Sequence, residues 1–361
     1  MFSTDDHRFM AQALRLAERG LYSASPNPRV GCVIVREGQV VGEGWHERAG
    51  TPHAEIHALQ QAGERMRGAT VYVTLEPCSH HGRTPPCADA LIAADVARVV
   101  AAMRDPNPQV AGQGMARLAR TGIQVEVGLM EAQALEMNIG FVARMTRGRP
   151  WVRLKAAASL DGKTALNNGV SKWITGPAAR SDVQHWRARS CAILTGVGTV
   201  LADDPQLNVR EIETTRQPLR VIVDSSLKTP PSAKILAGGN ALIACATDDA
   251  AKIQALRSAG AEVLVLAGSN GRVDLTRLLQ VLAEREVNEL MIEAGATLNG
   301  ALLNAGLVDE MVLYLAPILL GDAARGLFAL PELQQMDLRK ILAVQDVRLV
   351  GQDIRVLARV S

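Results

Sequence analysis

The chain has 361 residues, more than twice the roughly 150 residues of a typical domain, so we expect two domains. The formal net charge is only +2 and the sequence contains no block of Lys and Arg residues, which argues against a nucleic-acid binder. No apolar run reaches the roughly 18 residues of a membrane span, and the polar first residues predict no signal peptide.

The first part of the chain predicts alternating helices and strands, from Thr4 to about Arg144. Thr4 or Asp5 is expected to cap the first helix, whose buried face carries Phe9, Ala13, Leu16 and Ala17. Strands are predicted at 30–35, 40–45, 69–75, 96–101 and 123–127, and further helices at 54–62, 86–94, 114–120 and 131–144. This alternation indicates an α/β layer with a largely parallel portion.

A polar break at 147–150, Arg-Gly-Arg-Pro, divides the sequence into predicted domains at 1–147 and 148–361. Strands are predicted in the second domain at 151–157, 192–195, 219–223, 241–244, 263–266, 289–293 and 311–315. Helices are predicted between them at 178–188, 250–258, 275–285 and 298–305. The second domain is therefore also α/β, with a core of its own.

A pattern typical of a zinc-dependent deaminase lies in the first domain. His53 and Glu55 begin a predicted helix, Cys78 follows a strand, and Cys87 begins the next helix. Three such ligands hold Zn²⁺ and leave a fourth position for water, while a glutamate that is not a ligand moves the proton. A structural zinc site normally has four protein ligands and would leave Glu55 without a role. His57, one helical turn after His53, is the alternative fourth ligand.

The two cysteines of this pattern are unusually far apart. Eight residues separate them, whereas the usual nucleobase-deaminase pattern ends in C-x-x-C. The intervening segment contains His80, His81 and Arg83, which are either solvated loop residues or substrate contacts, and Arg83 suits a phosphate. Asn27, within Pro-Asn-Pro, is either a turn residue or an amide that recognises the edge of a pyrimidine.

The other cysteines, Cys32, Cys191 and Cys245, lie in apolar strand-like segments and are expected to be small buried hydrophobic residues. Five cysteines without the spacing of a disulfide framework indicate a reducing compartment, so we expect a cytoplasmic protein.

These motifs together resemble one known family. In the first domain they are Pro26-Asn27-Pro28, Gly42-Glu43-Gly44 with His46, His53-Ala54-Glu55, and the segment 74–87, TLEPCSHHGRTPPC. In the second domain they are SLDGK at 159–163, WIT at 173–175, LADDP at 201–205 and EAG at 293–295. Over its whole length the chain resembles the bifunctional deaminase/reductase family of bacterial riboflavin biosynthesis.

The resemblance implies a fold and two reactions. The implied fold is α/β, with an N-terminal cytidine-deaminase-like three-layer domain and a C-terminal dihydrofolate-reductase-like domain. The implied reactions are zinc-dependent hydrolytic deamination of a diaminopyrimidinone with a phosphoribosylamino arm, then NADPH-dependent reduction of the ribosyl group to ribityl. Zn²⁺ and NADPH are thus the expected cofactors. The expected partner is a small phosphorylated pyrimidine, not nucleic acid or membrane, and the chain is expected to form a homo-oligomer.

The resemblance also implies roles for individual residues. By match to the family's motifs, Glu55 is the catalytic proton shuttle, and the zinc ligands are His53, Cys78 and Cys87. The implied substrate contacts are Asn27, Arg83, Ser171, Arg187, Leu207, Arg210 and Glu293. The implied NADPH contacts are Ala157, Trp173, Thr199, Asp203, Ser225, Gly295, Ala296, Thr297, Leu298, Asn299, Gly300 and Ala301.

Several residues of the second domain also have simpler interpretations. Arg187 alone is typical of a helix surface. The turn at Gly295 either presents N–H groups to a phosphate or is only a chain reversal, and it departs from G-x-G-x-x-G. Lys155 meets the cofactor or the phosphate, or is an edge-strand charge. Asp203 either protonates the substrate or holds a cofactor hydroxyl, so the acid of the reductase stays unassigned.

Two other functions compete with the bifunctional enzyme. A nucleic-acid deaminase with an accessory domain would have a basic surface and the short cysteine spacing, and the sequence has neither. A non-catalytic binding protein stapled by zinc would not need Glu55.

Overall fold

The computed structural model describes residues 1–79, 86–108 and 110–360. They form two compact units, the N-terminal unit (Met1–Arg149) and the C-terminal unit (Pro150–Ser361). Among the described residues, no helix has both the length and the apolar character that crossing a bilayer requires.

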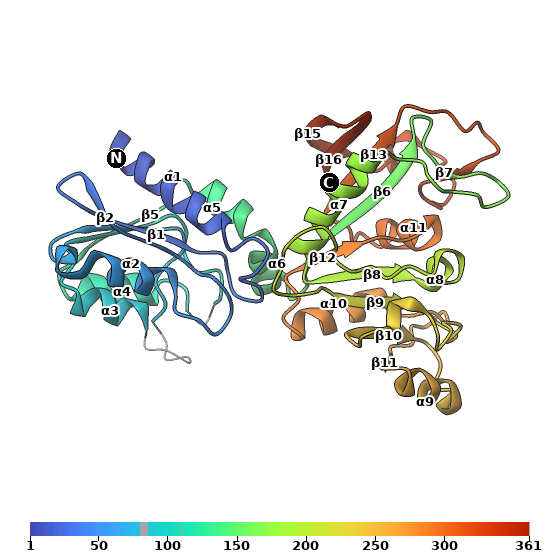
Figure 1. The fold of residues 1–361 in the computed structure, drawn as a ribbon, viewed down its shortest axis with the longest axis horizontal. Helices are drawn as coiled ribbons and strands as arrows, with labels where there is room; N and C mark the ends of the chain where they lie inside the picture. The colour runs from blue at the N-terminus through green and yellow to red at the C-terminus, as the bar shows by residue number, and fades with distance from the viewer. Residues whose placement is uncertain (80–85, 109, 361) are drawn as a thin grey trace. The chain divides into compact units, whose positions relative to one another are not determined.

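The N-terminal unit has three layers around a five-stranded sheet (Figure 1). The strand order is β2 (Gln39–Trp45), β1 (Gly31–Arg36), β3 (Thr70–Val73), β4 (Arg98–Ala101) and β5 (Gln124–Val127). The first three strands are antiparallel neighbours and the last three are parallel. One face carries α1 (Thr4–Glu18) and α5 (Glu131–Met137). The other face carries α2 (Ala54–Ala62), the short η1 (Gly63–Met66), α3 (Cys87–Ala93) and α4 (Gln113–Arg120).

Helix α1 buries the predicted apolar face but begins differently from the prediction. Ser3, and not Thr4 or Asp5, is the capping residue. The Ser3 hydroxyl accepts from the Asp6 N–H at 3.1 Å, and the Asp6 carboxylate accepts from the Ser3 N–H at 2.7 Å. This reciprocal pair satisfies two N–H groups at the helix start that would otherwise lack partners, which explains why the helix starts at this position.

The single helix predicted at 131–144 is wrong, because the structure has two helices there. Helix α5 ends at Met137 and α6 (Ile139–Arg147) follows Asn138. The Asn138 side chain accepts from the Arg29 N–H at 2.7 Å and donates to the Arg29 carbonyl at 3.0 Å. The backbone of Asn138 leaves helical geometry where these two bonds form.

The C-terminal unit is built on a nine-stranded mixed sheet. The strand order is β11 (Ala261–Val265), β10 (Ala241–Cys245), β9 (Leu219–Val223), β8 (Ala192–Gly196), β12 (Glu289–Ile292), β6 (Trp151–Ser159), β13 (Glu310–Ala316), β16 (Asp353–Val360) and β15 (Leu342–Val350). The strands from β11 to β13 are parallel to their neighbours, whereas β16 and β15 add an antiparallel edge.

Aliphatic cores lie on both faces of this sheet, as the low aromatic content requires. One core contains residues of α10 (Leu275–Glu284) and α11 (Ala296–Asn304). The other contains residues of α7 (Pro177–Arg189), α9 (Ala250–Ser258) and the short η2 (Lys234–Leu236). This division confirms an α/β unit with helices on both faces.

The sequence analysis missed several elements of the C-terminal unit. They are β7 (Lys163–Ala165), α8 (Val197–Asp203), η2, β14 (Arg325–Gly326), η3 (Met336–Leu338), β15 and β16. Strands β7 and β14 are too short to show a period. Strands β15 and β16 mix charged and apolar side chains, and β15 is mostly exposed. These segments therefore lack the alternation of buried and exposed side chains by which a strand is recognised in a sequence.

Candidate active sites

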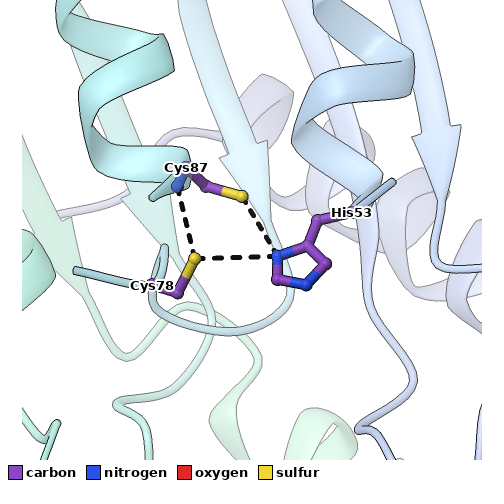
Figure 2. A group of neighbouring side chains, drawn as sticks. All are labelled: His53, Cys78 and Cys87. Carbon is purple, nitrogen blue, oxygen red and sulfur yellow. Dashed lines mark hydrogen bonds between the residues drawn. The ribbon is translucent and has the colours of Figure 1, made fainter. Parts of the chain in front are cut away.

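Three predicted zinc ligands meet at the ends of different elements in the N-terminal unit (Figure 2). His53 directly precedes α2, Cys87 begins α3, and Cys78 follows β3. The Nδ1 atom of His53 lies 3.2 Å from Sγ of Cys87 and 3.6 Å from Sγ of Cys78. Zinc bonds of about 2.0 Å to nitrogen and about 2.3 Å to sulfur place such atoms about 3.5 Å apart in a tetrahedral site. The three side chains therefore fit one zinc ion.

The two sulfurs have the chemistry of a cation site. The Cys87 side chain hydrogen-bonds to Cys78, and with His53 it holds the pKa of the Cys78 thiol below its ordinary value. The Cys87 N–H also donates to Cys78 Sγ at 3.2 Å. The pKa of Cys87 is raised, because its thiol interacts with the Cys78 sulfur and is buried. A divalent cation is the group that stabilises both as thiolates.

Glu55 lies beside this cluster as a buried acid. Its residue is 4 % exposed, and burial raises the pKa of its carboxyl to about 7. A carboxyl that exchanges its proton near neutral pH suits general acid–base catalysis. Among the described residues, the metal-binding group consists of His53, Cys78 and Cys87, without His57. The buried Nε2 atom of His57 has no hydrogen-bond partner within the described part of the chain.

Asn27 is connected to the cluster through His46, whose role the sequence left open. The Nδ1 atom of His46 lies 3.3 Å from the Pro52 carbonyl oxygen, so it carries the proton and donates. Its Nε2 atom therefore accepts from the Asn27 amide nitrogen at 3.1 Å. Burial lowers the pKa of His46, and the nearby His53 lowers it further, which keeps the ring neutral. This arrangement leaves the Asn27 amide oxygen available as an acceptor. Arg83, His80 and His81 lie outside the described residues.

A cavity of about 1070 Å³ opens at the carboxyl ends of the parallel strands in the C-terminal unit. This volume slightly exceeds the range of roughly 300–1000 Å³ that small-molecule sites usually have. The predicted cofactor residues on its wall are Thr199, Asp203, Ser225, Gly295, Ala296, Thr297, Leu298 and Ala301, joined by the predicted substrate residue Ser171. Helix α11 starts at this wall without a capping side chain, so its first N–H groups suit a pyrophosphate. The cavity therefore fits a dinucleotide such as NADPH.

Four predicted cofactor residues do not line this cavity. Asn299 donates to the Ala294 carbonyl at 3.0 Å and thereby holds the turn. Gly300 allows the backbone at Ala329 to lie directly against α11, because a Cβ at Gly300 would be 2.2 Å from the Ala329 oxygen. The third, Ala157, packs against the core within β6, and the fourth, Trp173, is 71 % exposed beneath the guanidinium of Arg180.

The sequence analysis missed one wall of the cavity, the loop between β11 and α10. Residues of this loop on the wall include Gly268, Ser269, Asn270 and Arg272. The loop is joined to a predicted site, because the Ser225 hydroxyl accepts from the Val273 N–H at 3.2 Å. Its only sequence signal is a Gly-Ser-Asn-Gly turn after a predicted strand, which is common in loops without a ligand.

A second polar cluster surrounds Glu293 at the end of β12. Arg187 donates two hydrogen bonds to the Glu293 carboxylate at 2.6 and 2.9 Å, and a third to the Asn208 carbonyl at 3.1 Å. Burial alone would raise the pKa of Glu293, but Arg187, followed by Lys155 and Arg210, lowers it. Three basic side chains thus lie near one carboxylate. Predicted residues Arg187, Arg210 and Glu293 come together here, and Leu207 is buried in the adjoining loop.

Comparisons with known proteins agree with both units. Residues 3–103 match the family model for the cytidine and deoxycytidylate deaminase zinc-binding region, and residues 150–353 match that for the RibD C-terminal domain. The riboflavin biosynthesis protein RibD of Escherichia coli is 50% identical over 363 residues, which cover 97% of this chain and 98% of the relative. The chain belongs to the RibD family.

Solved structures of the family have the same fold. A structure of Acinetobacter baumannii RibD has a TM-score of 0.92 at 48% identity and covers 99% of both chains. A Thermotoga maritima structure, described as a diaminohydroxyphosphoribosylaminopyrimidine deaminase/5-amino-6-(5-phosphoribosylamino)uracil reductase, has a TM-score of 0.89 at 33% identity, with 99% of both chains covered. The protein is therefore a bifunctional deaminase and reductase of riboflavin biosynthesis. The predicted fold class, function, Zn²⁺ and NADPH are confirmed.

Proposed function

We propose that the N-terminal unit deaminates a diaminopyrimidinone carrying a phosphoribosylamino arm, the substrate type in the description of the Thermotoga maritima structure. The observation that carries this assignment is a buried glutamate of raised pKa beside a three-ligand cluster. His53, Cys78 and Cys87 would hold Zn²⁺, which supplies Lewis-acid chemistry when bound. Glu55 takes a proton from the attacking water and returns it to the leaving amine, while the Asn27 amide oxygen accepts from an N–H group of the pyrimidine.

We further propose that the C-terminal unit reduces the deaminated product in the cavity and its adjoining cation cluster. Thr199, Ser225 and the start of α11 would hold NADPH, which would supply the hydride. Arg187 is held in place by Glu293, whereas the side chains of Lys155 and Arg210 have no hydrogen-bond partner among the described residues. Burial lowers the pKa of the Lys155 amine, and a phosphate near it would favour the charged form. Lys155 and Arg210 are therefore the groups assigned to the phosphate of the substrate.

Arg210→Gln tests this assignment of the phosphate. The variant should raise the KM for the phosphorylated intermediate at least about tenfold, because a charge-assisted hydrogen bond contributes about 1.5–3 kcal/mol. NADPH oxidation should be measured with the intermediate and with its dephosphorylated form, for which the variant and the wild type should have similar kcat/KM. An equal loss with both forms would show that Arg210 does not recognise the phosphate.

We infer that a second copy of the chain covers the edge of the C-terminal sheet at β15. Nine exposed large apolar residues lie between 330 and 349: Leu330, Leu333, Met336, Leu338, Ile341, Leu342, Val344, Val347 and Leu349. A long apolar edge strand promotes association unless it is covered. Its charges are already paired, because Asp346 binds both Arg348 and Arg355. A neutral, apolar strand edge suits an identical strand related by a two-fold axis.

Val347→Lys tests this interface. We expect it to halve the mass measured by light scattering, and Val265→Lys on the opposite edge strand, β11, is the matched control. An unchanged mass for Val347→Lys would refute the interface.

We also propose a cytoplasmic location, supported by five free cysteines, two of which are assigned to zinc. Cell fractionation tests this location.

A further inference from the structure

Helix α4 begins on a buried carboxylate from a distant segment. The Glu76 residue is 3 % exposed, and its two oxygens accept four backbone N–H groups. One oxygen accepts from Gly114 at 2.9 Å and Met115 at 3.3 Å, and the other from Gly112 at 2.9 Å and Asp105 at 3.2 Å. The residue before the helix, Gly112, has no side chain to cap it. Glu76 therefore caps α4 and binds it to the segment that carries Cys78.

The next residue of that segment also rests on α4. A Cβ atom at Gly114 would lie 1.9 Å from the Pro77 carbonyl oxygen, so only glycine allows this approach. The first turn of the helix thus contacts both residues that precede Cys78, through hydrogen bonds to Glu76 and through close packing against Pro77.

One turn later, Arg117 contacts the chain on both sides of the wide cysteine gap. Its guanidinium lies 2.6 Å from the Asp89 carboxylate and donates to the Ser79 carbonyl at 3.3 Å. Ser79 directly follows Cys78, and Asp89 lies two residues after Cys87. The Arg117 and Asp89 side chains are 42% and 32% exposed, and ion pairs in such positions contribute little to stability. The contact therefore matters more for geometry than for stability.

We propose that α4 is the positioning element of the metal site, with Glu76 and Arg117 as its positioning residues. In a C-x-x-C pattern, the chain itself fixes the distance between two thiolates. Eight intervening residues cannot do so, and here a separate helix holds the segments of Cys78 and Cys87 in register. Neither Glu76 nor Arg117 belongs to the cluster of metal ligands. This proposal rests on the assignment of both cysteines as zinc ligands.

Glu76→Gln and Gly114→Ala test the first contact. The glutamine amide would direct its NH₂ group at two backbone donors, and alanine would push on the Pro77 carbonyl. Changes in the hydrogen bonds behind a metal ligand typically weaken metal affinity about 10–100-fold. In competition with a zinc chelator, we expect the zinc affinity of both variants to fall within this range. The deaminase kcat should also fall, whereas the KM for the pyrimidine substrate should stay nearly unchanged. Gly114→Ala is informative because helix propensity alone would make alanine stabilising at this position.

Arg117→Gln and Arg117→Lys test the second contact. Gln loses the ion pair, whereas Lys keeps the charge but reaches only one partner at a time. We expect zinc affinity to fall by up to about tenfold for Gln and less for Lys. The Co²⁺-substituted protein should show shifted thiolate-to-metal bands in the same order. Arg120→Gln is the matched control, because Arg120 lies on the same helix, is exposed, and has no side-chain partner among the described residues.

Asp6→Asn separates positioning from instability. Asp6 is a buried, hydrogen-bonded carboxylate of the same unit, on α1 at the opposite face of the sheet. The Asp6→Asn variant should lower the free energy of unfolding without changing the zinc affinity or the cobalt spectrum. Wild-type zinc affinity and an unchanged cobalt spectrum in Glu76→Gln would overturn the proposal, as would an equal loss in Asp6→Asn. Cys78→Ala checks the underlying assignment independently, because zinc retained at wild-type affinity there would refute the ligand set itself.

Discussion

The two units build their sites in opposite ways. In the N-terminal unit, a few side chains of distinctive chemistry meet at short distances around one point. In the C-terminal unit, the cavity wall consists largely of small residues and turns at strand ends, with a separate ion cluster beside Glu293. A site made of rare side chains is visible in a sequence, whereas a site made of backbone is visible mainly in the fold.

Removal of zinc should have the largest effect, because it should abolish the activity of one unit and leave that of the other unchanged. We expect dialysis against a strong chelator to abolish ammonia release from the diaminopyrimidinone, because the ligand cluster found among the described residues lies in the N-terminal unit. NADPH oxidation with the deaminated intermediate should continue at the untreated rate. Added Zn²⁺ should restore deamination. Loss of both activities would mean that the units depend on one metal.

Glu55→Gln should lower the deaminase kcat by about 10²–10⁴-fold, the usual contribution of a general acid–base group. The zinc content should stay at one ion per chain, because Glu55 lies outside the ligand cluster. Reductase activity in the same sample is the control for correct folding. Deamination at the wild-type rate would contradict the role of Glu55 and favour a non-catalytic zinc site.

Glu293→Gln should destabilise the C-terminal unit by about 3–5 kcal/mol, because it leaves the guanidinium of Arg187 buried without its counter-charge. Urea denaturation followed by fluorescence measures this change. The double variant Glu293→Gln/Arg187→Met should recover part of the loss. Equal stabilities of the single and double variants would show that the ion pair is not the cause.

Asp6→Asn should have the smallest of these effects, about 2 kcal/mol at neutral pH. Burial alone would raise the pKa of Asp6, but bonds from Arg98, Tyr72 and Ser3 lower it far below its ordinary 3.8. A lowered pKa stabilises the fold above the unfolded value and loses this contribution as the pH falls toward the folded value. The stability difference between wild type and variant should therefore be full at pH 7 and shrink below about pH 4. A constant difference would show that Asp6 contributes through packing alone.

The helices and strands with one buried face were largely predictable from the sequence, and α2 and α9 have the predicted bounds. Predictions failed where a tertiary contact decides the local structure. Asn138 breaks a helix because of Arg29, which lies far away in the sequence. The capping of α4 by Glu76 has no sequence signal, because its donors are backbone N–H groups. The loop after β11 has only a common turn motif as its sequence signal, and it reaches the cavity because its strand lies beside β10.

Asn138 also has a consequence for the deaminase site. A carboxamide carries the same donor and acceptor as a peptide group, and Asn138 uses both on Arg29. It thus satisfies both backbone groups of Arg29, as a peptide group of a neighbouring strand would, two residues before β1 starts at Gly31. Aspartate would lose the donor, and alanine would lose both bonds. A single side chain of α5–α6 thereby fixes where the loop bearing Asn27 enters the sheet, from the opposite end of the unit's sequence.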